Sequence, residues 1–133
     1  MKKLLLVSVI CLSGCSSLID AYFLKYDPNE YAIISDIRTT SALSKEHCDD
    51  FQESKRNSTI ISAKTKGFKD YVQHTPHNDK VINSSIELDK IGQGLKDFYS
   101  KNDKVSPAFC KLKFDSIEKS AELMQKTIGA KPR

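Results

Sequence analysis

The sequence predicts an all-α fold, a small bundle of three or four helices, from three observations. Apolar residues recur at steps of three and four after residue 27, as on one face of a helix. No segment keeps the alternation of apolar and polar residues that a half-buried strand needs. Asp27-Pro28 and Ser106-Pro107 each place a capping side chain before a proline at the first helical position. At 133 residues, 39% of them hydrophobic and 29% charged, the chain fits one domain.

The first helix is predicted to begin at Asp27, with Pro28 at its first position and Glu30 three residues after the cap. Its apolar face carries Tyr31, Ile34 and Ile37. The pattern thins after Ile37, and it resumes with Cys48 and Phe51.

A second apolar stretch runs from Ile61 to Val72, and two topologies remain open for residues 28–73. In an up-and-down bundle of four helices, it forms a separate helix. In the other topology, one long helix runs to about His74 and pairs with the next helix. Tyr31, Ile33, Ile34 and Ile37 would then project as an apolar stalk that needs a partner or a membrane surface.

Two more helices follow, each with a clear apolar stripe. The stripe of the third comprises Val81, Ser84, Leu88, Ile91, Leu95 and Phe98. The stripe of the last comprises Cys110, Phe114, Ile117, Ala121, Met124 and Ile128. Gly129 and Pro132 mark where the last helix stops.

The N-terminus has the organisation of an export signal. Lys2 and Lys3 precede an apolar run over residues 4–12, and small residues follow. The run covers nine positions, whereas a membrane-spanning helix needs roughly 20. The sequence therefore predicts a cleaved signal and no permanent span in this segment.

The tetrapeptide Leu12-Ser13-Gly14-Cys15 resembles the lipobox of bacterial lipoproteins. The resemblance implies cleavage after Gly14, a diacylglycerol on the Cys15 thiol and an acyl group on its new amino group. Ser16 and Ser17 follow the cysteine, where the family's inner-membrane retention signal has Asp. The resemblance therefore implies an anchor in the outer membrane, on its periplasmic face. Residues 1–14 are then the signal peptide, 15–26 the lipidated cysteine and tether, and 27–133 the bundle domain.

The net charge of +4 is partly a property of the signal. Without Lys2 and Lys3, the balance is 19 basic against 17 acidic residues, or +2. The predicted compartment and the absence of any recognisable nucleic-acid-binding motif exclude nucleic acid as the expected partner.

Only two of the four cysteines are expected in the mature domain with a free thiol, because Cys11 leaves with the signal and Cys15 carries lipid. In an oxidising compartment, Cys48 and Cys110 are expected to form one disulfide. A redox or metal role is disfavoured because the sequence has no Cys-x-x-Cys and no histidine at ligand spacing beside either cysteine.

Other chemical signals are weak. His74, His77 and Asp79 have metal-ligand side chains, but a solvated turn explains them better than a metal site, because Pro76 intervenes and a further ligand is lacking. The sequence has no Gly-x-Ser-x-Gly elbow and no glycine-rich phosphate loop. No enzyme activity, catalytic residue, metal or cofactor is predicted beyond the acyl groups on Cys15.

These observations predict an anchored lipoprotein that acts as a non-catalytic binding or structural module for an unidentified envelope protein. The expected partner surface comprises Tyr22, Phe23, Tyr31, Ile34 and Ile37. One alternative is a cavity for a small apolar ligand or lipid. Its lining would be Phe68, Leu88, Leu95, Phe98, Phe114 and Met124. Another is a phage-encoded lipoprotein in lysis or superinfection exclusion.

Overall fold

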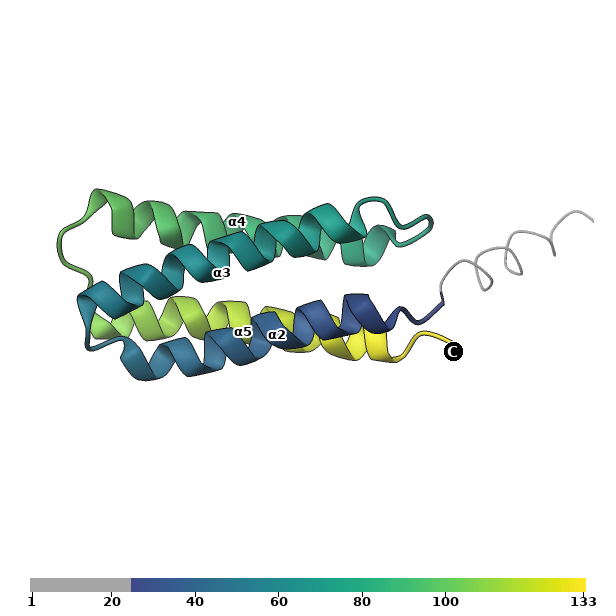
Figure 1. Cartoon of the computed structure of the whole chain (residues 1–133), viewed down its shortest axis with the longest axis horizontal. Helices are drawn as coiled ribbons and strands as arrows, with labels where there is room; N and C mark the ends of the chain where they lie inside the picture. The colour runs from purple at the N-terminus through teal and green to yellow at the C-terminus, as the bar shows by residue number, and fades with distance from the viewer. Residues whose placement is uncertain (1–24) are drawn as a thin grey trace, which may run out of the picture.

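The computed structural model describes residues 25–133, which form an up-and-down bundle of four long helices (Figure 1). Helix α2 spans Pro28–Ser44 and is followed by a short 3-10 helix, η1, at Lys45–His47. Helices α3, α4 and α5 span Phe51–Val72, Asp79–Lys101 and Pro107–Gly129. The predicted all-α class is confirmed.

Residues 45–50 turn the chain between α2 and α3, so the single long helix considered above does not form. Asp50 caps α3, because its side chain accepts a hydrogen bond of 3.0 Å from the backbone N–H of Glu53. Helix α3 then continues without a break to Val72. The alternative with an apolar stalk is therefore wrong, and the up-and-down alternative is right, because α2 is a full member of the bundle.

The two predicted proline-containing helix starts are present. Asp27 accepts hydrogen bonds from the backbone N–H groups of Asn29 (2.8 Å) and Glu30 (3.3 Å). Ser106 accepts one from the N–H of Phe109 at 3.2 Å. Both caps satisfy backbone donors that the first turn of a helix leaves free.

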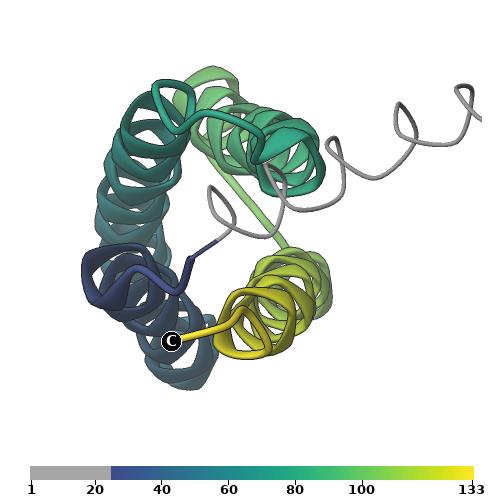
Figure 2. The ribbon, with the colours of Figure 1, turned by 90° about the vertical axis from the view of Figure 1, so that its right-hand side faces the viewer.

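The helices pack as two close pairs. Helix α3 packs most extensively on α4, and α2 on α5, whereas α4 and α5 touch each other least among neighbouring helices. The end view in Figure 2 shows the four helices around the bundle axis in the order α2, α3, α4, α5. The α4–α5 side is consequently the least closed side of the bundle.

Small residues bring α3 and α4 together. Ser54, Ser58, Ser62 and Thr65 of α3 are all buried. A Cβ atom added to Gly92 of α4 would lie 2.4 Å from the Thr65 Oγ1 atom, well inside contact distance. The pair is therefore held by close backbone approach as well as by the burial of large apolar side chains.

The core face of α4 differs from the predicted stripe. Ser85, Gly92 and Tyr99 face inward in place of their predicted neighbours Ser84, Ile91 and Phe98. Val81, Leu88 and Leu95 are buried as predicted. Neighbouring residues lie about 100° apart around a helix, so the predicted stripe and the buried residues occupy adjacent faces of α4. Together they make an apolar surface wider than the face that the core buries. The part of this apolar surface that the core does not bury lies on the side of α4 that faces α5.

Candidate functional site

One end of the bundle is closed by the Cys48–Cys110 disulfide, as predicted. Cys48 follows η1, and Cys110 lies in the first turn of α5. Their Cα atoms are 5.6 Å apart, and both side chains are buried. The bond ties the end of the first helical segment to the start of the last.

At the opposite end, the chain enters and leaves the bundle side by side (Figure 1). The backbone N–H of Tyr26 donates a 2.7 Å hydrogen bond to the carbonyl oxygen of Pro132. The Arg133 guanidinium lies 5.1 Å from the centroid of the Tyr26 ring, which in turn lies 5.8 Å from the ring of Tyr31. The segment that precedes residue 25 therefore leaves from a fixed point beside the C-terminal tail.

A buried polar latch, formed by Glu30, Asn78 and Lys131, holds this end together. The Lys131 ammonium donates to Glu30 Oε2 at 2.8 Å and to Asn78 Oδ1 at 2.9 Å. The Asn78 amide donates to Glu30 Oε1 at 2.9 Å. Glu30 and Asn78 are only 1% and 2% exposed. The sequence identified Glu30 as part of a helix start but gave no signal that its carboxylate is buried.

Asp27 links the same end to α3 through a 2.7 Å hydrogen bond from the Tyr71 hydroxyl. Burial raises the pKa of the Asp27 carboxyl. The hydrogen bonds from Tyr71 and from the N–H groups of Asn29 and Glu30 together outweigh burial, so its pKa lies below the ordinary 3.8. The same bond raises the pKa of Tyr71. The lowered pKa of Asp27 and the raised pKa of Tyr71 both favour an ionised Asp27 carboxylate that accepts a hydrogen bond from a protonated Tyr71.

A hollow of about 650 Å³, which we call the α4–α5 groove, lies between helices α4 and α5. Val81, Leu88 and Met124 are the buried apolar residues at its base, and Ile91 and Leu123 flank them. Leu123 is 67% exposed, the highest value among the large apolar residues of the described range 25–133. The other lining residues are polar: Lys80, Asn83, Ser84, Glu87, Ser120 and Thr127.

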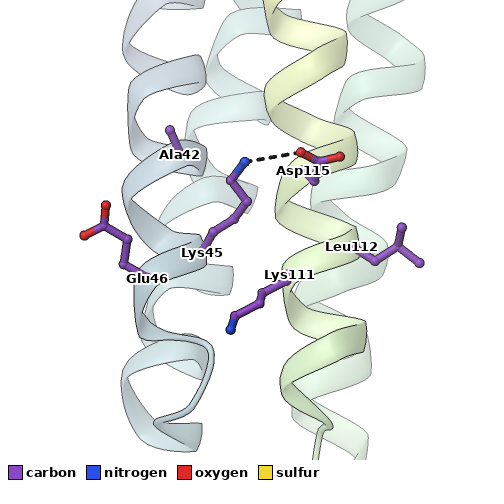
Figure 3. A pocket seen from close by; sticks show the side chains of 6 residues that line it. All are labelled: Ala42, Lys45, Glu46, Lys111, Leu112 and Asp115. Carbon is purple, nitrogen blue, oxygen red and sulfur yellow. Dashed lines mark hydrogen bonds and ion pairs between the residues drawn. The ribbon is translucent and has the colours of Figure 1, made fainter.

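A second hollow, of about 480 Å³, lies between the end of α2 and α5 (Figure 3). Lys45 crosses it to pair with Asp115 at 3.2 Å and with Glu118. The hydrogen bond to Glu118 raises the pKa of Lys45. Because its central charges already satisfy one another, this hollow offers less to a ligand than the α4–α5 groove.

The expected partner surface on the first helix is wrong in part. Ile34 and Ile37 are fully buried, because α2 packs its apolar face against α5 and the rest of the core. Tyr31 is half-buried beside Gly129. Tyr22, Phe23 and the predicted lipidation site, Cys15, lie outside the described residues.

The histidine cluster lies in and beside the exposed turn between α3 and α4. His74 contacts the neighbouring Gln73 side chain at 3.2 Å, and Asp79 begins α4. His77 has a positive φ of 57°. Across residues 25–133, no three His, Cys, Asp or Glu side chains gather closely enough to hold a metal ion.

The residues predicted to line a ligand cavity have three different environments. Phe68, Leu95 and Phe114 pack within the core. Leu88 and Met124 are buried too, but they also line the α4–α5 groove. Phe98 is 37% exposed and stacks on Phe109 with 4.3 Å between ring centroids, so its placement in the interior is wrong.

The groove itself was not predicted. Its α5 wall includes Leu123, which lies outside the predicted core stripe. An available signal was Leu123 itself, an apolar residue one position before the predicted core residue Met124 and therefore about 100° around the helix from it.

Comparisons with protein-family models, with curated proteins and with solved structures find no match for this chain. In the part that the structure describes, none of the helices is both long and apolar enough to cross a bilayer.

Proposed function

We propose that the protein is a lipoprotein anchored at Cys15 in the periplasmic face of the outer membrane, and that it works as a non-catalytic protein-binding module. The observation that carries the binding role is the α4–α5 groove, an apolar surface that the bundle leaves open. Complete burial of an exposed leucine is worth about 1.5–3 kcal/mol, so a partner that covers Leu123 gains substantial binding energy.

The anchoring role is supported by the lipobox and by the way the chain joins the bundle. Nine residues separate Cys15 from Lys25, and at no more than about 3.6 Å each they reach at most ~32 Å. The bond from Tyr26 to Pro132 fixes where this segment joins the bundle. An anchored bundle would stay close to its membrane, where it meets a restricted set of partners.

Fractionation of the envelope tests the anchor. The wild-type chain should incorporate labelled palmitate and sediment with outer membrane. Cys15→Ser should lose the label and appear in the soluble periplasmic fraction. A wild-type chain that carries no label and stays soluble would contradict the anchor.

Photocrosslinking in intact envelope tests the binding surface. A photoreactive amino acid at Leu123 should capture a protein as a discrete band. The matched control is the same substitution at Leu43, which is 56% exposed on α2, away from the groove. Equal capture from both positions, or none from Leu123, would argue against the groove as the binding surface.

A further inference from the structure

We propose that Lys131 and Asn78 react to form an intramolecular isopeptide bond, with Glu30 as the catalytic base and ammonia as the leaving group. The new bond is an amide between the lysine Nζ atom and the asparagine Cγ atom. Its formation needs only these three side chains, so it depends neither on the lipid anchor nor on a partner in the α4–α5 groove.

The polar latch places a nucleophile beside the group that it would attack. The structure shows the two side chains before reaction, with Lys131 Nζ 2.9 Å from Asn78 Oδ1. A C=O bond is about 1.23 Å long, so Nζ lies at most about 4.1 Å from the Cγ atom. Reacting atoms are poised at about 3–3.5 Å, so a small shift from the oxygen toward the carbon is enough.

Glu30 touches both of the nitrogen atoms whose bonds change. Its Oε2 atom accepts a hydrogen bond of 2.8 Å from the Lys131 ammonium. Its Oε1 atom accepts one of 2.9 Å from the Asn78 side-chain amide. One carboxylate can therefore take protons from the attacking nitrogen and give them to the leaving nitrogen.

Burial of the polar latch favours this chemistry. Glu30 and Asn78 are 1% and 2% exposed, and the Lys131 side chain is 9% exposed. A lysine must lose its positive charge before its nitrogen can attack. Proton transfer from Lys131 to Glu30 removes two charges from the interior, which lowers the cost of that step. Exclusion of water also protects the amide from hydrolysis.

The reaction balances without an oxidant or any further reagent. Glu30 takes one proton from the Lys131 ammonium, and the amine adds to Cγ of Asn78 as the C=O electron pair moves onto Oδ1. Glu30 then gives this proton to Nδ2, the Cγ–Nδ2 bond breaks, and the carbonyl forms again. The carboxylate takes the second surplus proton from Nζ and passes it to the departing ammonia. The products are one amide, one ammonium ion and the original carboxylate.

The bond would reinforce the bundle where its helices hold one another least. Asn78 directly precedes α4, and Lys131 follows α5. These two helices pack least closely among the neighbouring pairs. The Cys48–Cys110 disulfide lies at the opposite end. Together the two cross-links would close both ends of the bundle covalently.

Mass spectrometry of the mature chain with Cys15→Ser, reduced and denatured after prolonged incubation in the folded state, tests the proposal. The expected mass is below that of the reduced sequence by one ammonia. A tryptic digest should contain a branched peptide that joins residues 70–80 to residues 127–133. A chain that keeps its full sequence mass would overturn the proposal.

The same digest separates the cross-link from cyclisation of an asparagine, which also releases ammonia. Loss of ammonia from the peptide of residues 70–80, beside an unmodified peptide of residues 127–133, would place a succinimide at Asn78. This result would overturn the isopeptide bond.

Three variants test the roles of the side chains. Glu30→Gln removes the base and Lys131→Arg removes the primary amine, so both should keep the full sequence mass. Lys126→Arg is the matched control, because the exposed Lys126 pairs with Glu122 at 2.7 Å, and it should lose ammonia as the wild-type chain does. Circular dichroism melting must show that each variant is folded. A folded, cross-linked Glu30→Gln chain would overturn the catalytic role of Glu30, and the wild-type mass decides the bond itself even if a variant does not fold.

Discussion

Lys131 and Glu30 lie 101 residues apart in the sequence, yet they form a 2.8 Å ion pair inside one end of the bundle. Their side chains are 9% and 1% exposed. Lys131→Met should destabilise the fold by about 3–5 kcal/mol, because it leaves the Glu30 carboxylate buried without a counter-charge. Urea unfolding followed by circular dichroism measures the loss.

The double variant Glu30→Gln/Lys131→Met separates the cost of an unpaired charge from the cost of lost packing. It should regain most of the stability that Lys131→Met loses, because no charge then remains inside. A double variant as unstable as Lys131→Met would show that packing of the lysine stem dominates.

Gly92→Ala should destabilise the protein by about 1–3 kcal/mol, because the added Cβ has no room beside the Thr65 side chain. Gly94→Ala is the matched control two residues away on the same helix. A Cβ there meets nothing within 4 Å, so the variant should gain about 1 kcal/mol of helix propensity. Thermal melting of both variants measures the difference.

Thr65→Ala removes Oγ1 and Cγ2, the two closest atoms to the new Cβ, and keeps the Thr65 Cβ at 3.3 Å, so it should relieve part of the Gly92→Ala defect. The interaction free energy from the four-variant cycle should be favourable. Strict additivity would show that the defect arises elsewhere on α4.

Reduction of the Cys48–Cys110 disulfide should lower the free energy of unfolding by about 4 kcal/mol on the chain-entropy argument, since the bond joins residues 62 apart. Urea unfolding with and without a reductant measures this loss. Cys48→Ala/Cys110→Ala should behave like the reduced protein and be insensitive to the reductant.

The low pKa of Asp27 predicts a contribution to acid sensitivity. A carboxyl whose pKa is lowered by folding stabilises the protein above its ordinary value of 3.8 and loses that contribution as pH falls through the lower folded value. Asp27→Asn keeps a capping side chain but cannot ionise. It should flatten the decline in stability below about pH 4, measured by urea unfolding at several pH values.

Tyr71→Phe should reduce the same pH dependence, because it removes a hydrogen bond to the Asp27 carboxylate. At neutral pH it should cost about 0.5–1.5 kcal/mol. An unchanged acid profile in both variants would contradict the role given to Asp27.

Helix existence and the disulfide were predictable because their causes are local or compositional. Asp27 and Ser106 act as caps within one turn, and only Cys48 and Cys110 remain once Cys11 and Cys15 are assigned to the predicted signal and lipid anchor. The end of α2 was left open because the capping Asp50 lies in a polar stretch without Gly or Pro.

The rest depends on contacts between distant segments. The sequence around Glu30 does not indicate that its side chain pairs with residue 131, so the polar latch could not be predicted. The choice of Tyr99 over Phe98 for the core depends on how α4 is rotated against α3, and Gly92 allows that close approach. The groove exists because α4 and α5 pack least closely, a property of the assembled bundle.

The pairing of helices sets an order of folding events. Helices α3 and α4 are joined by only residues 73–78, so their contact closes a short loop. The α2–α5 contact encloses that whole hairpin and must close a much longer loop, which is slower and costs more entropy. The α3–α4 hairpin should therefore form first. Cys48 and Cys110 would then meet only as α5 docks, which makes oxidation a late event that locks a nearly complete bundle.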